Sequence, residues 1–390
     1  MRNWLSLITV MLVLTAAVAS PAAAQDTRIR IQERIENRIV IPGEILAEVR
    51  RLIDTAISQD VRDEIRRSLE RVATDIRRIP STIVTPAYGR VYGVEQNREF
   101  TTQQTDRQTK TLAIGATGAL ALRNVVGDIT VKTGGGREVT VEIVRVARGR
   151  TDADARRGLE RVQAEVTTRG ERGSVIARYP DERRPPYSVS VAYAVTAPAG
   201  TRITIDTITG TVHVAGLQGD LAVTGVSGNV TVSSCARLTK VQTISGEITV
   251  SDSQADGRME LGSVGASIRV TNVKADRLTA SVVSGAVIAR EVQANGASMS
   301  TMSGNLEYSG PVSARGRYEF SAHSGDVRLG ITGGFDLEAS TFSGRVATEP
   351  SLGLTSTSAR VRSLRGAVAG GGAAVIARTF SGSVWVGRKL

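Results

Sequence analysis

The chain has 390 residues, of which 4% are aromatic, 22% are charged and 40 are glycine, a composition that favours short strands and tight turns over a helical or disordered chain. Its single cysteine, Cys235, excludes an intrachain disulfide and a cysteine-based zinc site, and is expected to be a buried small residue. The net charge of +11 is spread along the chain without interleaved aromatic residues, so no nucleic-acid partner is expected.

Residues 1–24 have the pattern of a Sec signal peptide. Arg2 precedes an apolar run from Trp4 to Ala19, and small residues lead to a cleavage site after Ala24. The alternative is a membrane anchor, but the run is short for a span of about 20 residues. We therefore expect a protein exported by Sec, without a transmembrane segment after cleavage, that is periplasmic, on the outer surface or secreted.

Residues 25–80 are predicted to be a helical segment, as one kinked helix or two short ones. The opposite side from the apolar stripe carries arginines among carboxylates, which is typical of a solvated face. The stripe could form a coiled-coil seam or lie against the β-structure. Residues 81–110 are polar, lack periodicity and are predicted to be a linker. The apolar residues at helical spacing are Ile45, Val49, Leu52 and Ala56, then Val61, Ile65, Leu69, Val72 and Ile76.

Residues 111–200 are predicted to be a β-rich part that caps the N-terminal end of the repeats after it. Alternating apolar residues indicate strands at 139–144, 174–178 and 187–196. Between the first two of these, residues 152–166 have the spacing of a short amphipathic helix.

Residues 201–390 contain a degenerate repeat of the form Ser-Gly-x-Val-x-Val, and an earlier copy begins at Val125. The first seven steps between copies are 18 to 21 residues, and the last step of 38 is interpreted as two steps with a degenerate copy around 361–368. Each unit is too small to bury its own apolar side, so the period indicates stacked coils of strand, turn and strand. The aligned small residue falls at 210, 228, 246, 266, 285, 304, 325, 344 and 382.

The predicted fold is therefore all-β, a right-handed β-solenoid (β-helix) of roughly 19-residue coils preceded by an N-terminal helical segment. About nine coils would make a rod of roughly 40 Å. The apolar residue before Ser-Gly is predicted to point inward, and the glycine to allow a corner with positive φ. The serine hydroxyl is predicted to bond to the turn or to the next coil. No cap is evident after the last repeat.

The strand that ends in Ala-Pro-Ala-Gly-Thr-Arg-Ile (197–203), followed by iterated T-x-S-G-x-V-x-V, resembles the DUF4097 domain of exported bacterial proteins. The segment L-A-L-R-N-V-V-G-D-I-T-V-K-T-G-G-G-R-E-V-T-V (120–141) is similar to the usual opening of that family. The resemblance covers about 111–388. It implies a β-solenoid of the envelope or cell surface with an adhesin label, and it brings no catalytic residues.

No catalytic, cofactor-binding or metal-binding residue is predicted, and no cofactor. A glycosidase needs two carboxylates at catalytic separation, but the acidic residues after the repeat glycine, Glu247 and Asp326, are about four coils and roughly 19 Å apart. His213 is expected on the surface and His323 in the core, and neither has a partner at metal-ligand spacing. Gly370–Gly372 lacks the residues of a phosphate loop and is interpreted as a turn.

The sequence thus predicts a non-enzymatic exported scaffold of the envelope or surface, adhesin-like, which presents a flat β-face to a partner. The expected partner is a cell-surface or envelope polymer or protein. One alternative is a carbohydrate-active enzyme on a β-helix. The other is a self-assembling structural envelope protein, a homo-oligomer that forms through the helix at 45–78 or through an exposed coil end.

Overall fold

The computed structural model describes residues 100–182, 185–354 and 362–390. This part of the chain is mostly β-strand, with one α-helix, α6 (Asp152–Arg161), and one short 3-10 helix, η3 (Pro350–Leu352). Its strands form one continuous mixed sheet. The predicted signal peptide, the predicted helical segment and residues 81–99 of the predicted linker lie outside the described residues.

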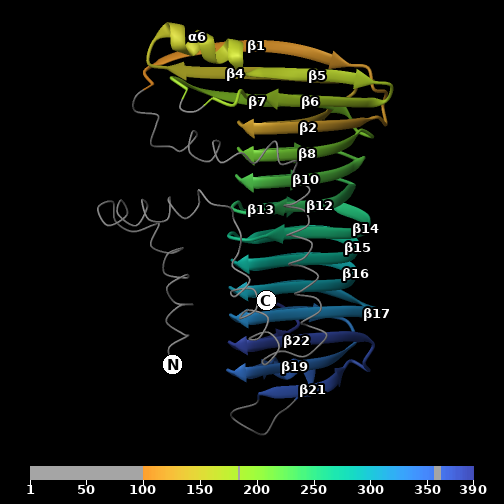
Figure 1. Ribbon diagram of the computed structural model, residues 1–390. Coiled ribbons are helices and arrows are strands. Elements are labelled where there is room, and N and C mark those ends of the chain that lie inside the picture. The colour runs from red at the N-terminus through yellow and green to blue at the C-terminus, as the bar shows by residue number, and fades with distance from the viewer. Residues whose placement is uncertain (1–99, 183–184, 355–361) are drawn as a thin grey trace, which may run out of the picture. The chain divides into compact units, whose positions relative to one another are not determined.

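The strands form two rows that enclose one core (Figure 1). Three long strands, β15 (Ile268–Ser284), β16 (Val287–Ser303) and β17 (Leu306–Ser324), begin in the second row and end in the first. The first row contains, in spatial order, β5 (Gln163–Arg169), β6 (Arg172–Arg178), β2 (Ala119–Val126), β8 (Arg202–Thr209), β10 (Asp220–Ser227), β12 (Arg237–Thr243), β14 (Gln254–Ser263), the ends of β15, β16 and β17, then β22 (Ala373–Ser381), β19 (Phe335–Ser343) and β21 (Ser363–Val368). The second row contains β1 (Thr102–Leu112), β4 (Val139–Gly149), β7 (Tyr187–Pro198), β3 (Ile129–Gly134), β9 (Val212–Ala215), β11 (Val230–Ser233), β13 (Ile248–Ser251), the beginnings of β15, β16 and β17, then β18 (Val327–Thr332), β23 (Val384–Gly387) and β20 (Val346–Thr348).

Each repeat supplies one strand to each row and pairs in parallel with the equivalent residues of the next repeat. Leu221 of β10 pairs with Ile203 of β8 in the first row, and Val230 of β11 pairs with Val212 of β9 in the second. We call one such strand–turn–strand unit a rung. The early copy that begins at Val125 is also a rung, because β2 and β3 pair in register with β8 and β9.

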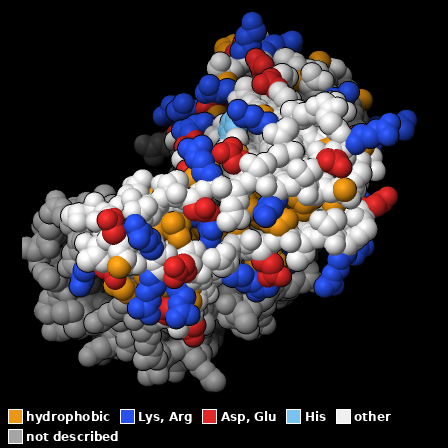
Figure 2. All heavy atoms as spheres, turned by 90° about the horizontal axis from the view of Figure 1, so that it is seen from above, with side chains coloured by type: hydrophobic (Ala, Val, Ile, Leu, Met, Phe, Trp, Pro, Cys, Tyr) orange, Lys and Arg blue, Asp and Glu red, His pale blue; other side chains and the backbone are white. Residues whose placement is uncertain are grey.

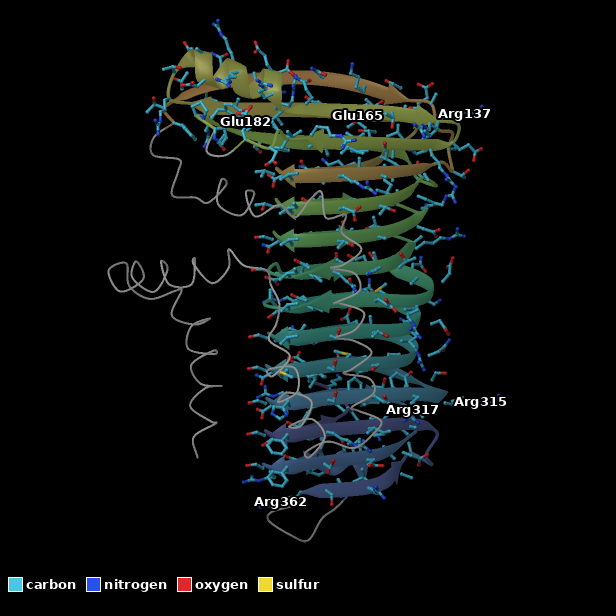
Figure 3. The ribbon with its side chains drawn as sticks, in the orientation of Figure 1. Arg137, Glu165, Glu182, Arg315, Arg317 and Arg362 are labelled. Carbon is cyan, nitrogen blue, oxygen red and sulfur yellow. The ribbon has the colours of Figure 1, made fainter. Side chains whose placement is uncertain are left out.

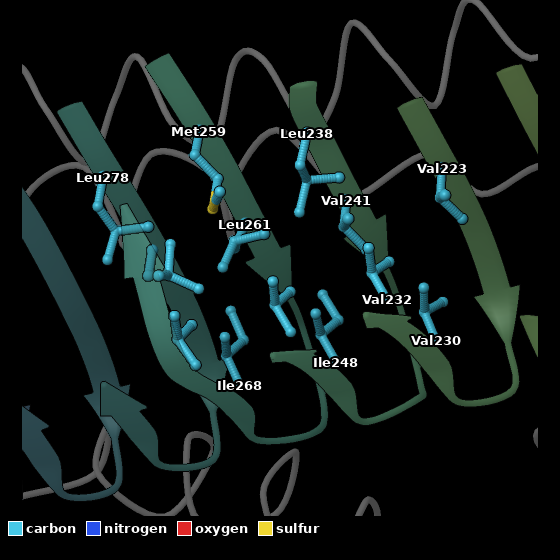
Figure 4. Close-up of a cluster of buried hydrophobic side chains, with 14 of the residues drawn as sticks. Val223, Val230, Val232, Leu238, Val241, Ile248, Met259, Leu261, Ile268 and Leu278 are labelled. Atoms are coloured by element: carbon cyan, nitrogen blue, oxygen red, sulfur yellow. The ribbon is translucent and has the colours of Figure 1, made fainter. Parts of the chain in front are cut away.

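The core lies between the two rows. Alternate residues of a strand point to opposite faces of a sheet, and the inward positions of both rows are occupied mainly by Val, Ile, Leu and Ala. Figure 4 shows Val241 and Leu261 of the first row opposite Val232 and Ile248 of the second, and all four side chains are buried. Each rung therefore completes its core only by stacking on its neighbours, as the period of the sequence indicates.

The corner of a rung is glycine because the backbones of successive rungs touch there. A methyl group on Gly304 would overlap the carbonyl oxygen of Gly285, and one on Gly325 would overlap that of Gly304. The φ angles of Gly304 and Gly325 are +147° and +149°, in the left-handed region that side chains avoid. The prediction of a positive-φ corner is confirmed at these rungs.

Polar side chains on both sides of the corner bond to the next rung. The Thr301 hydroxyl donates to the carbonyl oxygen of Gly285 at 3.0 Å. After the glycine, Oδ1 of Asn305 accepts from the backbone N–H of Asp326 at 3.0 Å. The threonine two residues before the serine and the residue after the glycine thus form hydrogen bonds between neighbouring rungs. The sequence had predicted such bonds for the serine hydroxyl.

Antiparallel strands and α6 lie at the N-terminal end of the stack (Figure 1). The helix begins with a capping box at Thr151 and ends at Arg161 because Val162 is extended. The helix predicted for 152–166 is therefore too long, since Gln163–Arg169 is β5. The predicted linker is also wrong in its last part, where Thr102–Leu112 is β1 and pairs with β4. Its polar residues suit a strand at the edge of the sheet.

Arg145 connects β4 to β1 and α6. Its guanidinium bonds to the Asp106 carboxylate at 2.6 Å and to the carbonyl oxygens of Leu159 and Val162 at 2.9 and 2.8 Å. We expect Arg145→Met to lower the free energy of unfolding by about 2–4 kcal/mol, because the buried acceptors lose their partner. Urea denaturation followed by circular dichroism measures this loss.

The matched control for Arg145 is another arginine that bridges the same two strands. Arg107 of β1 pairs with Glu142 of β4 at 3.4 Å, and both side chains are exposed. Arg107→Met should change stability by less than about 1 kcal/mol, since exposed pairs contribute little. Equal losses in the two variants would show that burial of Arg145 has no special role.

The last strands do not stack in chain order. β22 pairs with β17 on one side and with β19 on the other (Figure 1). In the second row, β23 pairs with β18 and with β20. The prediction that the copy at Phe380 ends the stack is therefore wrong. So is the degenerate copy predicted around 361–368, because Ser363–Val368 is β21 and runs antiparallel to β19. This strand covers the end where the sequence showed no cap.

Candidate functional site

One column of apolar residues points out of the stack along the C-terminal ends of the first-row strands, the arrowheads in Figure 1. These are the residues before each Ser-Gly pair, and the prediction that they point inward is wrong. The residue before each one, such as the buried Thr301 before Met302, points inward, so alternation turns the next side chain outward. This column, the outer ridge, contains in spatial order Val125, Ile208, Val226, Ile244, Val264, Val283, Met302, His323, Phe380 and Phe342.

The outer ridge becomes more exposed toward its aromatic end. Val283 is 39% exposed, Met302 43%, Phe380 36% and Phe342 66%. Among the described residues, these are four of the five large hydrophobic side chains that are exposed, the fifth being Leu390. Single exposed apolar residues are common, but a contiguous group marks an interaction surface. No exposed apolar surface was predicted here, although strict period-2 alternation through the buried threonines would have revealed it.

Three rings stack at this end of the ridge, one from each of three neighbouring rungs. The centroids of His323 and Phe380 are 5.1 Å apart, with an angle of 5° between the ring planes. The centroids of Phe380 and Phe342 are 4.8 Å apart, with an angle of 4°. The rings thus face one another, and Phe380 is covered by a ring on both of its faces. The prediction of a core His323 is wrong, whereas His213 points outward from the second row and is half-buried.

Uncharged hydroxyl groups border three neighbouring rungs of the ridge, those of Val283, Met302 and His323. Two residues before the ridge position is a serine, and directly after it is the serine of the repeat motif. Neither column carries a charge in these three rungs. The serines of the rungs at Val283, Met302 and His323 are Ser281 and Ser284, Ser300 and Ser303, and Ser321 and Ser324.

The charged residues nearest the ridge are paired. Arg378, beside Phe380, bonds to Glu338 at 2.9 Å, and this bond lowers the pKa of the Glu338 carboxyl. At the other end, Arg123 lies 3.5 Å from Asp206, whose pKa is raised by burial. Arg365 contacts the same Glu338 carboxylate at 3.2 Å, so these pairs offset only part of the charge beside the ridge.

Other parts of the surface carry charges of both signs. On the face seen in Figure 2, Lys and Arg side chains are interspersed with Asp and Glu among uncharged atoms. Figure 3 places Arg315 and Arg317 at the edge of the first row opposite its arrowheads, and Arg317 pairs with Glu319. The serine-bordered rungs of the ridge differ from these parts in charge.

The family model described as Toastrack DUF4097 matches residues 118–366, more than half of the chain. The chain belongs to the DUF4097 toastrack family. Every ridge residue except Phe380 lies within the matched toastrack segment, and β22 and β23 follow it in the sequence.

Three solved structures are similar to this toastrack protein. A candidate cell adhesion protein from Clostridium sporogenes is 10% identical, with 73% of this chain and 99% of that chain covered and a TM-score of 0.22. A candidate adhesin from Parabacteroides distasonis is 12% identical, with 72% and 97% covered and a TM-score of 0.41. Another from Bacteroides fragilis is 13% identical, with 72% and 97% covered and a TM-score of 0.35. No curated protein matches the chain.

The two carboxylates considered as a catalytic pair, Glu247 and Asp326, are not neighbours in the described part of the toastrack protein. Glu247 and Asp326 lie four rungs apart, as predicted. In the described ranges, no group of three or more His, Cys, Asp or Glu side chains could hold a metal ion. Cys235 is buried, as predicted, and burial raises the pKa of its thiol. No helix within the described residues has the length and apolar character needed to span a membrane.

A surface groove of about 710 Å³ lies beside the C-terminal residues of the toastrack protein. Arg290 in its wall is paired with Glu307 at 2.8 Å. The other lining residues include Glu291, Arg388 and Lys389. Because charges of both signs line it, the groove shows no preference for one class of ligand, and the outer ridge is the stronger candidate site.

Proposed function

We propose that this toastrack protein is a non-enzymatic, exported, adhesin-like scaffold, and that the outer ridge is its contact surface. The observation that carries the proposal is the gathering of Val283, Met302, Phe380 and Phe342 in one column, because these are four of the five exposed large hydrophobic side chains among the described residues. In this proposal the stack is a right-handed β-solenoid, and its regular rungs place the residues of the outer ridge in one line. Export through the signal peptide at 1–24 would place the ridge in the periplasm, on the outer surface or in the medium.

The chemistry of the ridge favours a protein partner that carries an uncharged apolar stripe. A charged partner would lose hydration beside the rungs at Val283, Met302 and His323 without gaining an ion pair, because the bordering positions there are serines. A sugar ring packs best on an exposed aromatic face, but both faces of Phe380 are covered by neighbouring rings. An extended apolar surface can pack along the whole column.

The dimensions of the ridge suit a protein interface. Its nine steps at strand spacing make a length of about 43 Å, and a width of five residues adds about 16 Å. The resulting area of roughly 700 Å² is close to the roughly 800 Å² that each partner contributes to a standard interface. Rigid backbone ladders reduce the entropy that such a surface loses on binding.

The proposal is tested by removing the apolar character of the ridge without changing its charge. The ridge variant carries Met302→Ser, Phe380→Ser and Phe342→Ser. The control variant carries Ile288→Ser and Ile376→Ser, which remove outward, half-buried apolar side chains elsewhere on the two rows. Mature wild type and both variants are tested by biolayer interferometry against purified envelope and extracellular-matrix proteins and against a glycan array.

We expect wild type and the control variant to bind at least one protein of the panel, and the ridge variant to bind it at least about tenfold more weakly, since buried aromatic anchors dominate interface energies. Binding to no protein, or equal binding by the ridge variant, would contradict the proposal. Binding to glycans alone would reject the partner class. Turnover of a polysaccharide would instead favour the carbohydrate-active enzyme.

A further inference from the structure

The C-terminal strands occupy an internal position of the stack. β22 lies between the end of β17 and β19 (Figure 1). In the second row, β23 lies between β18 and β20. Residues 373–387, which we call the C-terminal insert, therefore form a rung that is last in sequence but has a rung on each side. Without the insert, the strands of its two neighbours would be about 9.6 Å apart, which is two strand spacings.

The insert makes the same contacts to both neighbours that the other rungs make. The backbone N–H of Gly325 donates to the Ser381 carbonyl oxygen at 2.8 Å, and the N–H of Gly382 donates to that of Ser343 at 3.0 Å. The Thr379 hydroxyl donates to the Gly325 carbonyl oxygen at 2.9 Å. The inward side chains of the insert, Ala373, Val375, Ala377, Val384 and Val386, are all fully buried.

Chain connectivity makes this rung different from its neighbours. β18 ends at Thr332 and β19 begins at Phe335, so residues 333–334 already connect the rungs on either side. The insert arrives later through β21, which pairs with the outer side of β19. The insert can therefore enter or leave the stack while its two neighbours stay covalently connected. Removal of an earlier rung would instead interrupt the chain that joins its neighbours.

We propose that the space between β17–β18 and β19–β20 is a peptide-binding site for a strand–turn–strand segment of the type Thr-x-Ser-Gly-x-Val-x-Val. Its occupant in this chain is the C-terminal insert, and the same segment of a second copy can take its place. Recognition comes from backbone hydrogen bonds on two edges and from the buried inward side chains, as in other strand-addition complexes. Exchange of an identical element between copies is a low-cost route to assembly.

The test uses the whole mature chain with a protease site inserted after Gly353, where added atoms meet open space. After cleavage, we expect the fragment that begins at residue 354 to remain bound in gel filtration at micromolar concentration. A fluorescent peptide of residues 354–390, which represents the segment of a second copy, should then replace it and acquire high fluorescence anisotropy.

Two altered peptides separate specific insertion from loose association. Gly382→Val should weaken competition at least about tenfold, because a Cβ there would overlap the carbonyl oxygen of Gly325. Ser381→Val adds similar bulk one residue earlier, at an exposed side chain, and should compete like the wild-type peptide.

Three results would overturn the proposal. One is release of the fragment on cleavage while the remaining chain keeps its circular dichroism and melting temperature. Another is equal competition by the Gly382→Val peptide. The third is failure of the wild-type peptide to replace the bound fragment, which would show that the site does not accept a second copy's segment.

Discussion

Replacement of Gly304 by valine is expected to lower the free energy of unfolding by about 3–5 kcal/mol, the sum of left-handed backbone strain and overpacking. Its φ of +147° disfavours a branched side chain, and a Cβ would overlap the carbonyl oxygen of Gly285. Backbone cannot move aside as a flexible side chain can, so the two rungs must separate. At about 2–4 °C per kcal/mol for a unit of this size, the melting temperature should fall by roughly 6–20 °C.

Differential scanning calorimetry measures this loss, and Gly257→Val is its matched control. Gly257 lies in β14, is exposed, and has nothing within 4 Å of an added Cβ. Valine suits a strand, so this variant should keep or slightly raise the melting temperature. Similar losses in both variants would show that the close approach of the rungs is not the reason for glycine at the corner.

Phe320→Ala should lower the free energy of unfolding by about 3–5 kcal/mol, because truncation of a buried aromatic residue leaves a cavity. Phe320 is 1% exposed and packs on Tyr308, with ring centroids 5.0 Å apart. Tyr308 also contacts Tyr318, whose hydroxyl accepts a hydrogen bond from the N–H of Ser313 at 2.9 Å. The cavity would therefore open in the largest aromatic cluster of the core.

The control for Phe320→Ala is the same substitution on the outer ridge. Phe342 is 66% exposed, so Phe342→Ala should cost less than about 1 kcal/mol and leave the unfolding transition nearly unchanged. Urea unfolding followed by tyrosine fluorescence compares the two. A large loss with Phe342→Ala would mean that the ridge serves stability rather than contact with a partner.

The sequence predicted the stacked repeats because their cause is local. Each rung repeats the same apolar alternation and the same corner glycine, and a period near 19 has one simple structural meaning. The early copy at Val125 is detectable for the same reason. The strand predicted for 174–178 likewise corresponds to β6, where Val175 and Ala177 point inward.

The direction of the ridge side chains was mispredicted because apolar residues were assigned to the core by type. Alternation alone gives the opposite answer, since Thr301, Thr341 and Thr379 occupy the buried positions. Their hydroxyls are satisfied by carbonyl oxygens of neighbouring rungs, which makes burial of a polar group possible. The pattern that would have predicted the outward direction of the ridge was thus a buried Thr directly before an apolar residue.

The order of the last rungs was mispredicted for a different reason. Repeats that look alike can stack on any neighbour, so the motif at Phe380 does not distinguish the end of the stack from the space between His323 and Phe342. The position that the last copy takes in the stack depends on β21, which reverses the chain direction. That reversal lies in a segment without the repeat pattern.

The most direct test of the outer ridge is site-specific photo-crosslinking to a protein that the mature chain binds. A benzophenone amino acid replaces Phe342 or Met302 on the ridge, and Ile376 on the first row outside it. We expect covalent adducts from positions 342 and 302 and none from position 376. Adducts from position 376 alone would place the contact surface elsewhere and contradict the role of the ridge.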